Sequence, residues 1–212
     1  MKQSNQRTGV SLNRPVFNRI EGLHPFKMIN YLFISVSCLL FAFITFMFIK
    51  HLAFELNGEF SFYLPKFFTV SAILLICSVY FTTKMLHAFK NDNISYLRKL
   101  LVYTLITGMI FFISQSLAWI EMLDQTQFFE TRNDIPNYIF TFSALHLAYV
   151  FAGMIMSGIF FYKYMLIEND PVKTLIATTN PVEKVRLQVF ATFWHFNVLA
   201  WTLIFLMLLF IF

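Results

Sequence analysis

Two histidines lie inside apolar, uncharged stretches of the chain and are its strongest candidates for chemistry. His146 is in "TFSALHLAYVFAG" and His195 is in "FWHFNVLAW". A neutral imidazole can ligate haem iron, and it can equally form hydrogen bonds. At about 1.5 Å per helical residue, the two rings lie at depths in a membrane that are compatible with a shared site. The sequence lacks the paired histidines or helix spacing of a transmembrane cytochrome. Hydrogen bonding between helices is therefore favoured, and a metal or haem site is the alternative.

Other polar side chains accompany the histidines in these apolar stretches. Trp194, Asn197 and Trp201 are spaced to share one face of a helix, while His195 points about 100° away. Trp201 is too deep for an interfacial anchor, so it is expected to pack inside a bundle. Gln115 interrupts a third apolar stretch. Because buried polar groups need partners, these side chains are expected to face protein and to join helices.

Small residues recur in the stretch that contains His146. Ala144, Ala148 and Ala152 are four residues apart, and Gly153 is followed by Ser157. Small residues at this spacing let helices approach closely in a membrane, where no water drives their association. The pattern predicts helix packing, not a binding site.

The composition indicates which elements carry these residues. Hydrophobic residues make up 58% of the 212 positions and charged residues only 13%, against about 25% charged in soluble domains. The apolar residues gather in runs of the roughly 20 residues that cross a bilayer. We expect an all-α, polytopic membrane protein in which an N-terminal segment, 1–27, precedes one bundle, 28–212. Its five transmembrane helices are predicted at about 28–49, 65–87, 98–122, 137–163 and 189–212.

The basic residues alternate between the loops and predict an orientation. All sixteen except Lys50, Lys66 and Arg132 lie in the N-terminal segment or in the second and fourth loops. The positive-inside rule therefore places the N-terminus in the cytoplasm and the C-terminus in the periplasm. Since these charges form no single patch, nucleic acid is not an expected partner. The first span is expected to direct insertion, because no signal peptide precedes it. Cys38 and Cys77 are interpreted as small apolar side chains.

Charged residues are absent from the middle of every predicted span. Proton and ion pathways usually use ionisable groups within the membrane. This absence argues against a translocation pathway through the chain alone. Five spans without repeats or a broken helix also make a small membrane transporter the weaker hypothesis.

Four motifs, in order, resemble subunit III of the haem-copper oxidases, which include cytochrome c oxidase. "WHF" followed by Trp201 resembles the pattern W-H-F-x-D-x-x-W of that family's last helix, and "SALHLAYVFAG" resembles T/S-G-x-H-G-x-H-V-x-x-G. "GMIFFISQSLAWIE" resembles G-x-x-F-x-x-x-Q-x-x-E-Y-x-E, and "YLPKFFTVSAILLICSVYFTTKMLHAFKND" resembles the preceding helix. The resemblance covers about residues 28–212 and is to the short, five-helix bacterial form.

The matches and departures are both informative. The matching positions are Gln115, Glu121, His146, Gly153, Trp194, His195, Phe196 and Trp201. By the same alignment, Ser37, Ala118 and Val198 replace acids, Gln188 replaces a glutamate, and Tyr149 replaces a second histidine. Losing these acids removes any part they would play in proton supply. We interpret the remaining polar residues as structural contacts between helices: Gln115, Glu121, His146, Gly153, Trp194, His195, Asn197 and Trp201.

The resemblance implies a non-catalytic subunit of a terminal oxidase in an aerobic respiratory chain, in the bacterial inner membrane. Its partners would be oxidase subunits I and II, with a quinol-oxidising complex as a further candidate in a supercomplex. Haem and copper would be held by the partner subunits, and this chain would have no cofactor, metal or catalytic centre of its own. It would hold phospholipid between its helices and protect the proton-uptake entrance. A subunit III-like accessory protein of a nitric oxide reductase is the alternative.

Overall fold

The structure is a computed structural model that describes residues 24–55, 63–125 and 135–212. Within these ranges the chain is all-helical, with six helices and no strand. Five of them are long and apolar enough to cross a membrane, so the chain is a multi-pass membrane protein and the predicted helical class is confirmed. The helices are α2 (Pro25–Glu55), α3 (Lys66–Lys90), α4 (Ile94–Gln125), α5 (Ile135–Ile167), α6 (Pro171–Thr179) and α7 (Pro181–Ile211).

The helices extend beyond the predicted spans because capping residues, not hydrophobicity, decide where a helix begins. The prediction for the last span began at residue 189, whereas α7 begins at Pro181. Asn180 caps this helix by accepting from the backbone N–H of Val182 at 2.9 Å, and proline is well suited to the first helical position. Asp170 caps α6 in the same way, within a loop in which the sequence predicted only a surface segment.

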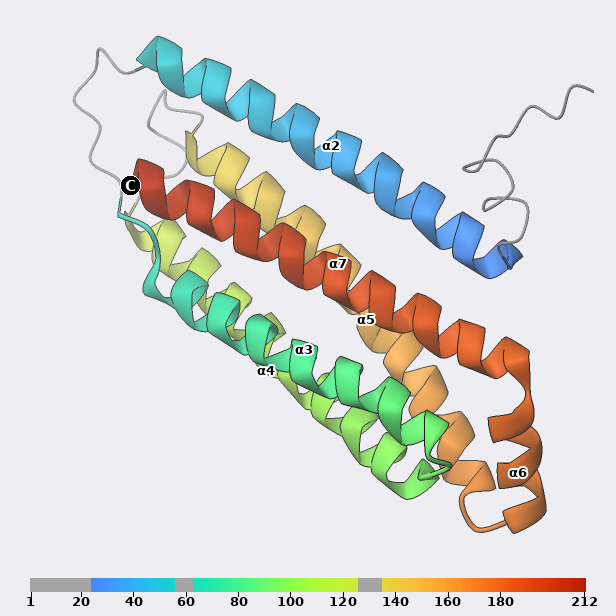
Figure 1. Ribbon diagram of the computed structural model, residues 1–212. Coiled ribbons are helices and arrows are strands. Elements are labelled where there is room, and N and C mark those ends of the chain that lie inside the picture. Colours follow the sequence, from blue (N-terminus) through green and yellow to red (C-terminus); the bar gives the residue numbers. More distant parts are fainter. Residues whose placement is uncertain (1–23, 56–62, 126–134) are drawn as a thin grey trace, which may run out of the picture.

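Figure 1 shows the long helices running side by side, with α3, α4, α5 and α7 in a group and α2 along its edge. The start of α2, the turn between α3 and α4, and helix α6 lie at one end, hereafter the α6 end. The C-terminus lies at the opposite end. Helix α7 is central, because it contacts α2, α3, α5 and α6.

A tight turn joins α3 to α4 and makes them an antiparallel pair. Asp92 in this turn has a positive φ of 53°, a conformation that Asn and Asp tolerate better than most residues. Asn93 then caps α4, since its Oδ1 accepts from the backbone N–H of Tyr96 at 2.9 Å. The polar run "NDN" thus supplies both the turn and the start of the next helix.

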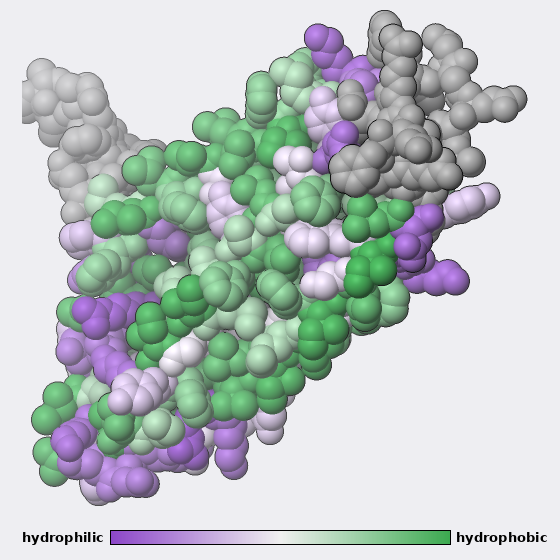
Figure 2. Space-filling model, turned by 180° about the vertical axis from the view of Figure 1, so that it is seen from behind, coloured by the Kyte–Doolittle hydropathy of each residue, from purple (hydrophilic) through white to green (hydrophobic). Residues whose placement is uncertain are grey.

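The surface is divided into an apolar belt and two hydrophilic ends. Figure 2 shows the hydrophobic residues across the middle of the molecule and the hydrophilic ones gathered towards the ends. Large apolar side chains are well exposed on the outer faces of the helices, as at Leu39 of α2 and Ile113 of α4. Such a belt is unfavourable in water and suits contact with lipid or with another membrane subunit.

Candidate functional site: polar contacts between helices

Two tryptophans of α7 form hydrogen bonds to two serines of α3. The indole Nε1 of Trp194 donates to Ser78 Oγ at 2.8 Å, and that of Trp201 donates to Ser71 Oγ at 3.1 Å. All four residues are buried. The two tryptophans are seven residues apart, as are the two serines, so one antiparallel register satisfies both bonds. We call this pair of contacts the Trp–Ser ladder.

His195 extends the same interface towards the α6 end. Its Nε2 lies 3.0 Å from Thr82 Oγ1 and 3.4 Å from Thr83 Oγ1, both on α3. The ring is only half-buried, and it also lines a pocket beside α2. Its polar contacts are therefore with α3, on a side of α7 that does not face His146.

His146 of α5 contacts the opposite side of α7. Its Nε2 lies 2.9 Å from the backbone oxygen of Asn197, its ring stacks on Trp201 at 4.9 Å, and Phe111 meets it edge-on at 5.4 Å. The two histidines thus engage different neighbours and do not face a shared centre. Nor does any group of three His, Cys, Asp or Glu suited to a metal occur within the described ranges.

Gly153 lets α5 approach α7 closely. A Cβ at this position would lie 2.9 Å from the ring of Trp194, a distance at which something must shift. Ser157, one turn further on, is also buried and donates to the backbone oxygen of Leu101 on α4 at 3.3 Å. This part of the small-residue pattern does pack between helices.

Two alanines of that pattern do not pack between helices. Ala148 and Ala152 are exposed, so the expectation that the whole stripe packs is wrong for them within this chain. The reason is geometric: adjacent residues such as Ala152 and Gly153 point about 100° apart on a helix. The small residues of α5 therefore occupy two faces, and only the face with Gly153 and Ser157 meets the bundle.

The two predicted residues of α4 have different positions. Gln115 is fully buried, and its side-chain amide has no hydrogen-bond partner among the residues that the structure describes. Glu121 is half-buried, and its Oε2 lies 3.1 Å from the backbone nitrogen of Lys66, at the start of α3. A carboxylate at a helix N-terminus accepts otherwise unpaired N–H groups and interacts favourably with the helix dipole.

Helix α2 is held by a different set of residues. The hydroxyl of Tyr149 on α5 donates to Ser37 Oγ on α2 at 2.9 Å. Aromatic contacts surround this bond, with Phe33 and Phe41 of α2 at 5.6 Å and 5.7 Å from the Tyr149 ring. Towards the α6 end, the side-chain amide of Asn30 donates to the backbone oxygen of Val189 at 3.5 Å, which is long for a hydrogen bond.

A groove follows the seam between α2 and α7. Its deeper part is a cavity of about 480 Å³ with an almost entirely apolar lining, including Phe41, Ala42 and Leu203. Nearer the α6 end is a more polar pocket of about 300 Å³, and Lys27 supplies its cationic group. The remaining polar side chains of this pocket are those of Asn30, Tyr31, Gln188, Thr192 and His195. The seam thus contains an apolar cavity and, nearer the α6 end, a more polar pocket with one cationic side chain.

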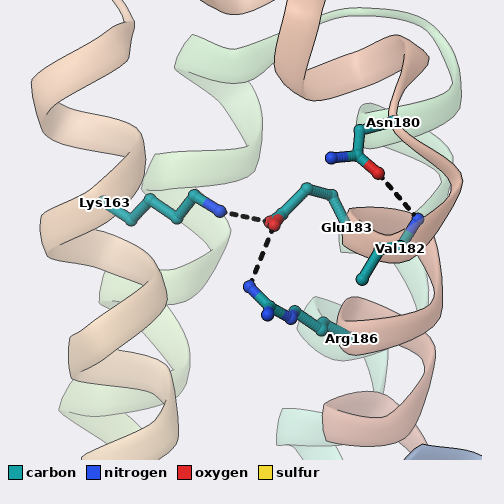
Figure 3. Close-up of polar contacts among 5 residues, drawn as sticks. All are labelled: Lys163, Asn180, Val182, Glu183 and Arg186. Atoms are coloured by element: carbon teal, nitrogen blue, oxygen red, sulfur yellow. Dashed lines mark hydrogen bonds and ion pairs between the residues drawn. The ribbon is translucent and has the colours of Figure 1, made fainter.

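Sequence reasoning missed the charged cluster around Glu183. This side chain is only 7% exposed, and it pairs with Lys163 of α5 at 2.5 Å and with Arg186 at 3.1 Å. Figure 3 shows Glu183 between these two cations. The sequence places Glu183 in a charged loop between the predicted fourth and fifth spans, where a solvated side chain is expected. The available signal was the capping pattern of "NPVE", in which Asn180 precedes the helix and a glutamate stands at its third position.

The serines of the Trp–Ser ladder were missed as well. They belong to a scatter of hydroxyl residues in the apolar spans, which gives no reason to select any of them. Their seven-residue spacing matches that of Trp194 and Trp201, which was the one available signal.

Comparison with known proteins adds no relative. No protein-family model matches the sequence, and no curated protein matches it. The functional argument therefore depends on the residues and on their geometry.

Proposed function

We propose that this chain is the non-catalytic subunit III of a haem-copper terminal oxidase in a bacterial inner membrane. The observation that carries the proposal is the contact between Ser37 and Tyr149. In the resemblance to subunit III, these positions on two distant segments correspond to a glutamate and a histidine. Here their side chains form a 2.9 Å hydrogen bond. Both positions differ from the residues of the family, and the two side chains are in contact. This contact supports the alignment, because a neutral pair has replaced an ionisable pair at one place.

The other matching residues also meet in space. His146 stacks on Trp201, and Gly153 lies against Trp194, so motifs from two spans form one contact surface. A resemblance that arose by chance would have no reason to bring its matching residues together in the fold. This agreement is a second, independent support for the proposal.

The proposed role is that of a scaffold. Polar side chains of α3, α5 and α7 form bonds between helices, as at Ser78, His146 and Trp194, and haem and copper belong to the partner subunits in this proposal. By the positive-inside rule, the basic residues favour a cytoplasmic position for the α6 end, where α2 begins. The exposed apolar belt would then pack against subunit I and the surrounding lipid, and would protect the proton-uptake entrance.

The groove between α2 and α7 gives this role a lipid component. In the proposed orientation its polar pocket would be at the membrane surface, and its apolar part would run inward over residues 196–207 of α7, about 17 Å at the rise of a helix. That length is close to half of the roughly 30 Å hydrocarbon core. A phospholipid with its phosphate near Lys27 fits these dimensions and would fill the seam in the assembled complex.

Purification tests the proposal directly. A tagged chain extracted from its native membrane in mild detergent is expected to bring haem and copper with it in stoichiometric amounts, together with two larger subunits identified by mass spectrometry. The isolated chain is expected to show no Soret absorption. Copurification of haem with non-haem iron and no copper would assign the chain to a nitric oxide reductase instead. A chain that purifies alone and transports a solute in liposomes would overturn the scaffold role.

A pair of variants tests the observation that carries the proposal. Ser37→Glu places a carboxyl group beside Tyr149 and is expected to reduce assembly, whereas adding Tyr149→His would restore the ionisable pair of the family and recover it. Leu39→Glu on the exposed side of α2 is a matched control that Tyr149→His is not expected to rescue. Assembly is measured as haem recovered per tagged chain. If the double variant assembles no better than Ser37→Glu, the alignment of these positions is wrong.

A further inference from the structure

Three buried side chains near the centre of the bundle carry polar atoms without a protein partner among the described residues. They are both amide atoms of Gln115, Nδ1 of His146 and Oδ1 of Asn197. Gln115 and His146 are 0% exposed and Asn197 is 1% exposed. A buried polar group without a hydrogen bond destabilises the folded state, because it has lost its contacts with water and gained none in return. Such groups are rare in native proteins and call for an explanation.

Asn197 and His146 touch through the 2.9 Å contact between the Asn197 backbone oxygen and Nε2. The register of α4 and α5 brings Gln115 to the same level. These antiparallel helices are joined by Ser157 to Leu101 at one end and by Trp119 to Ser143 at the other. Between these two bonds, equal steps along the two helices place Gln115 opposite residues close to His146.

The contacts of α4 with α7 also indicate that Gln115 lies near His146. A Cβ at Gly108 would lie 3.5 Å from the ring of Trp194. Helices α4 and α7 run in the same direction, and seven residues onward in each are Gln115 and Trp201. Trp201 stacks on the His146 ring, and Phe111, one turn before Gln115, touches both rings. Gln115 therefore flanks the stacked His146–Trp201 pair.

The hydrogen-bonding groups of these residues are complementary to water. A carbonyl oxygen only accepts, so Nε2 of His146 carries the proton and Nδ1 of the neutral ring is an acceptor. Oδ1 of Asn197 is a second acceptor, because its Nδ2 already donates to the Phe193 oxygen at 3.0 Å. Gln115 supplies an N–H donor and a third acceptor. A water molecule offers two donors and two acceptors, and buried waters typically make about three hydrogen bonds.

We propose that Gln115, His146 and Asn197 form an internal hydration site, in which ordered water bridges α4, α5 and α7. The water donates to His146 Nδ1 and to an amide oxygen, and it accepts from the Gln115 amide. The site is distinct from the Trp–Ser ladder and from the groove beside α2. It makes the centre of the bundle polar but uncharged.

Solid-state NMR of the full chain in phospholipid bilayers tests this proposal, with nitrogen-15 labels in histidine and glutamine. Magnetisation is expected to pass from water protons to the side-chain nitrogens of His146 and Gln115. The Nδ1 resonance is expected at the position of a hydrogen-bonded acceptor. An Nδ1 resonance at the free-acceptor position would overturn the proposal. A direct nitrogen–nitrogen coupling between Gln115 and His146 without water transfer would also overturn it.

Two variants locate the water. Gln115→Leu is expected to abolish water transfer to His146 and to move Nδ1 downfield to the free-acceptor position. Gln188→Leu, a change of the same chemistry in the pocket beside α2, is expected to leave both signals of His146 unchanged. If Gln115→Leu folds and His146 keeps both its water transfer and its shift, Gln115 does not hold the water. If this variant does not fold, the wild-type spectrum still decides between a hydrated, a directly bonded and a free ring.

Discussion

Helix α7 is bound on two sides by very different interfaces. Towards α3 it makes the Trp–Ser ladder and the His195 contacts, which are short side-chain bonds in one register. Towards α2 the seam contains the 3.5 Å Asn30 contact, aromatic packing and a cavity of about 480 Å³. In a bilayer the apolar surfaces of α2 and α3 can contact lipid as favourably as they contact α7, so hydrophobicity cannot distinguish these interfaces. Polar bonds and close packing specify the first, while the second leaves room for a further molecule.

Truncation of an aromatic side chain on each side should show the largest difference. Trp194→Ala removes a fully buried ring and leaves Ser78 without its donor, so it is expected to lower the free energy of unfolding by about 3–5 kcal/mol. Phe41→Ala removes the contact with the Tyr149 ring and enlarges a cavity that already opens beside α2, but it leaves no polar group unpaired and is expected to cost clearly less. Thermal unfolding in mild detergent, followed by circular dichroism, measures both. Equal losses would mean that the two interfaces are packed alike.

Glycine substitutions in α5 test a third contact of α7, that between α5 and the Trp194 ring. Gly153→Ala pushes a methyl group against the Trp194 ring and is expected to destabilise the fold by about 1–3 kcal/mol. Gly158→Ala is the matched control, because a Cβ there meets nothing within 4 Å. That change should be neutral or stabilising by up to about 1 kcal/mol through helix propensity. A Gly153→Ala variant as stable as the control would show that α5 and α7 are not in close contact.

Removal of one hydroxyl from α3 and one from α2 isolates two hydrogen bonds, that of Ser78 to α7 and that of Ser37 to α5. Ser78→Ala leaves the buried Trp194 N–H unpaired and is expected to cost about 1–2 kcal/mol. Ser37→Ala is expected to cost about 0.6 kcal/mol, a typical value for one bond between helices in a membrane. The half-buried Tyr149 can reorient its hydroxyl towards the seam. The same unfolding assay distinguishes them, and a larger loss for Ser37→Ala would show that α2 is held more strongly by its hydrogen bond than α3 is by the bond of Ser78.

The smallest effect is expected outside both interfaces, at the start of α6. The backbone N–H of Lys173 is the main group that lowers the pKa of Asp170, and the Lys173 ammonium and the Val172 N–H add to it. Because the folded pKa lies below the unfolded one, this stabilisation is present above about pH 4 and is lost as the pH falls through the folded pKa. Amide exchange of α6 should therefore quicken in acid.

Substitutions at Asp170 check that assignment. Asp170→Ala should speed amide exchange of α6 at neutral pH and leave α3 and α7 unaffected. Asp170→Asn keeps a capping oxygen, so it should retain most of the protection and lose its dependence on pH. If acid has the same effect on the asparagine variant as on the wild type, another group controls the helix.

The sequence was sufficient for the helical class and for the five spans, because the bilayer requires long apolar runs that are visible in any one chain. It also identified Trp194, Trp201 and His146 as buried contacts, since a polar group in such a run must find a partner. The ends of the helices were less predictable. They depend on capping by residues such as Asn180 and Asp170, which hydropathy does not register.

The partners of the identified residues could not be predicted, and the reason is also physical. Each span has several hydroxyl side chains, and only the relative rotation and register of two helices selects Ser71 and Ser78 from among them. The same holds for α5, where the sequence showed small residues but not which of their two faces would meet α7. The burial of Glu183 was hidden by its position in a loop of charges. Periodicity describes one helix at a time, whereas these contacts are properties of pairs.

The Trp–Ser ladder has a consequence for the order of biogenesis. During synthesis α3 enters the bilayer before α4, α5 and α7, so the indoles that pair with its serines emerge only after two further spans have been made. Until α7 is inserted, Ser71 and Ser78 of α3 lack their indole partners. A nascent chain halted before α7 would therefore expose two hydroxyl groups on α3 without their indole donors, so insertion of α7 is the step that completes this interface.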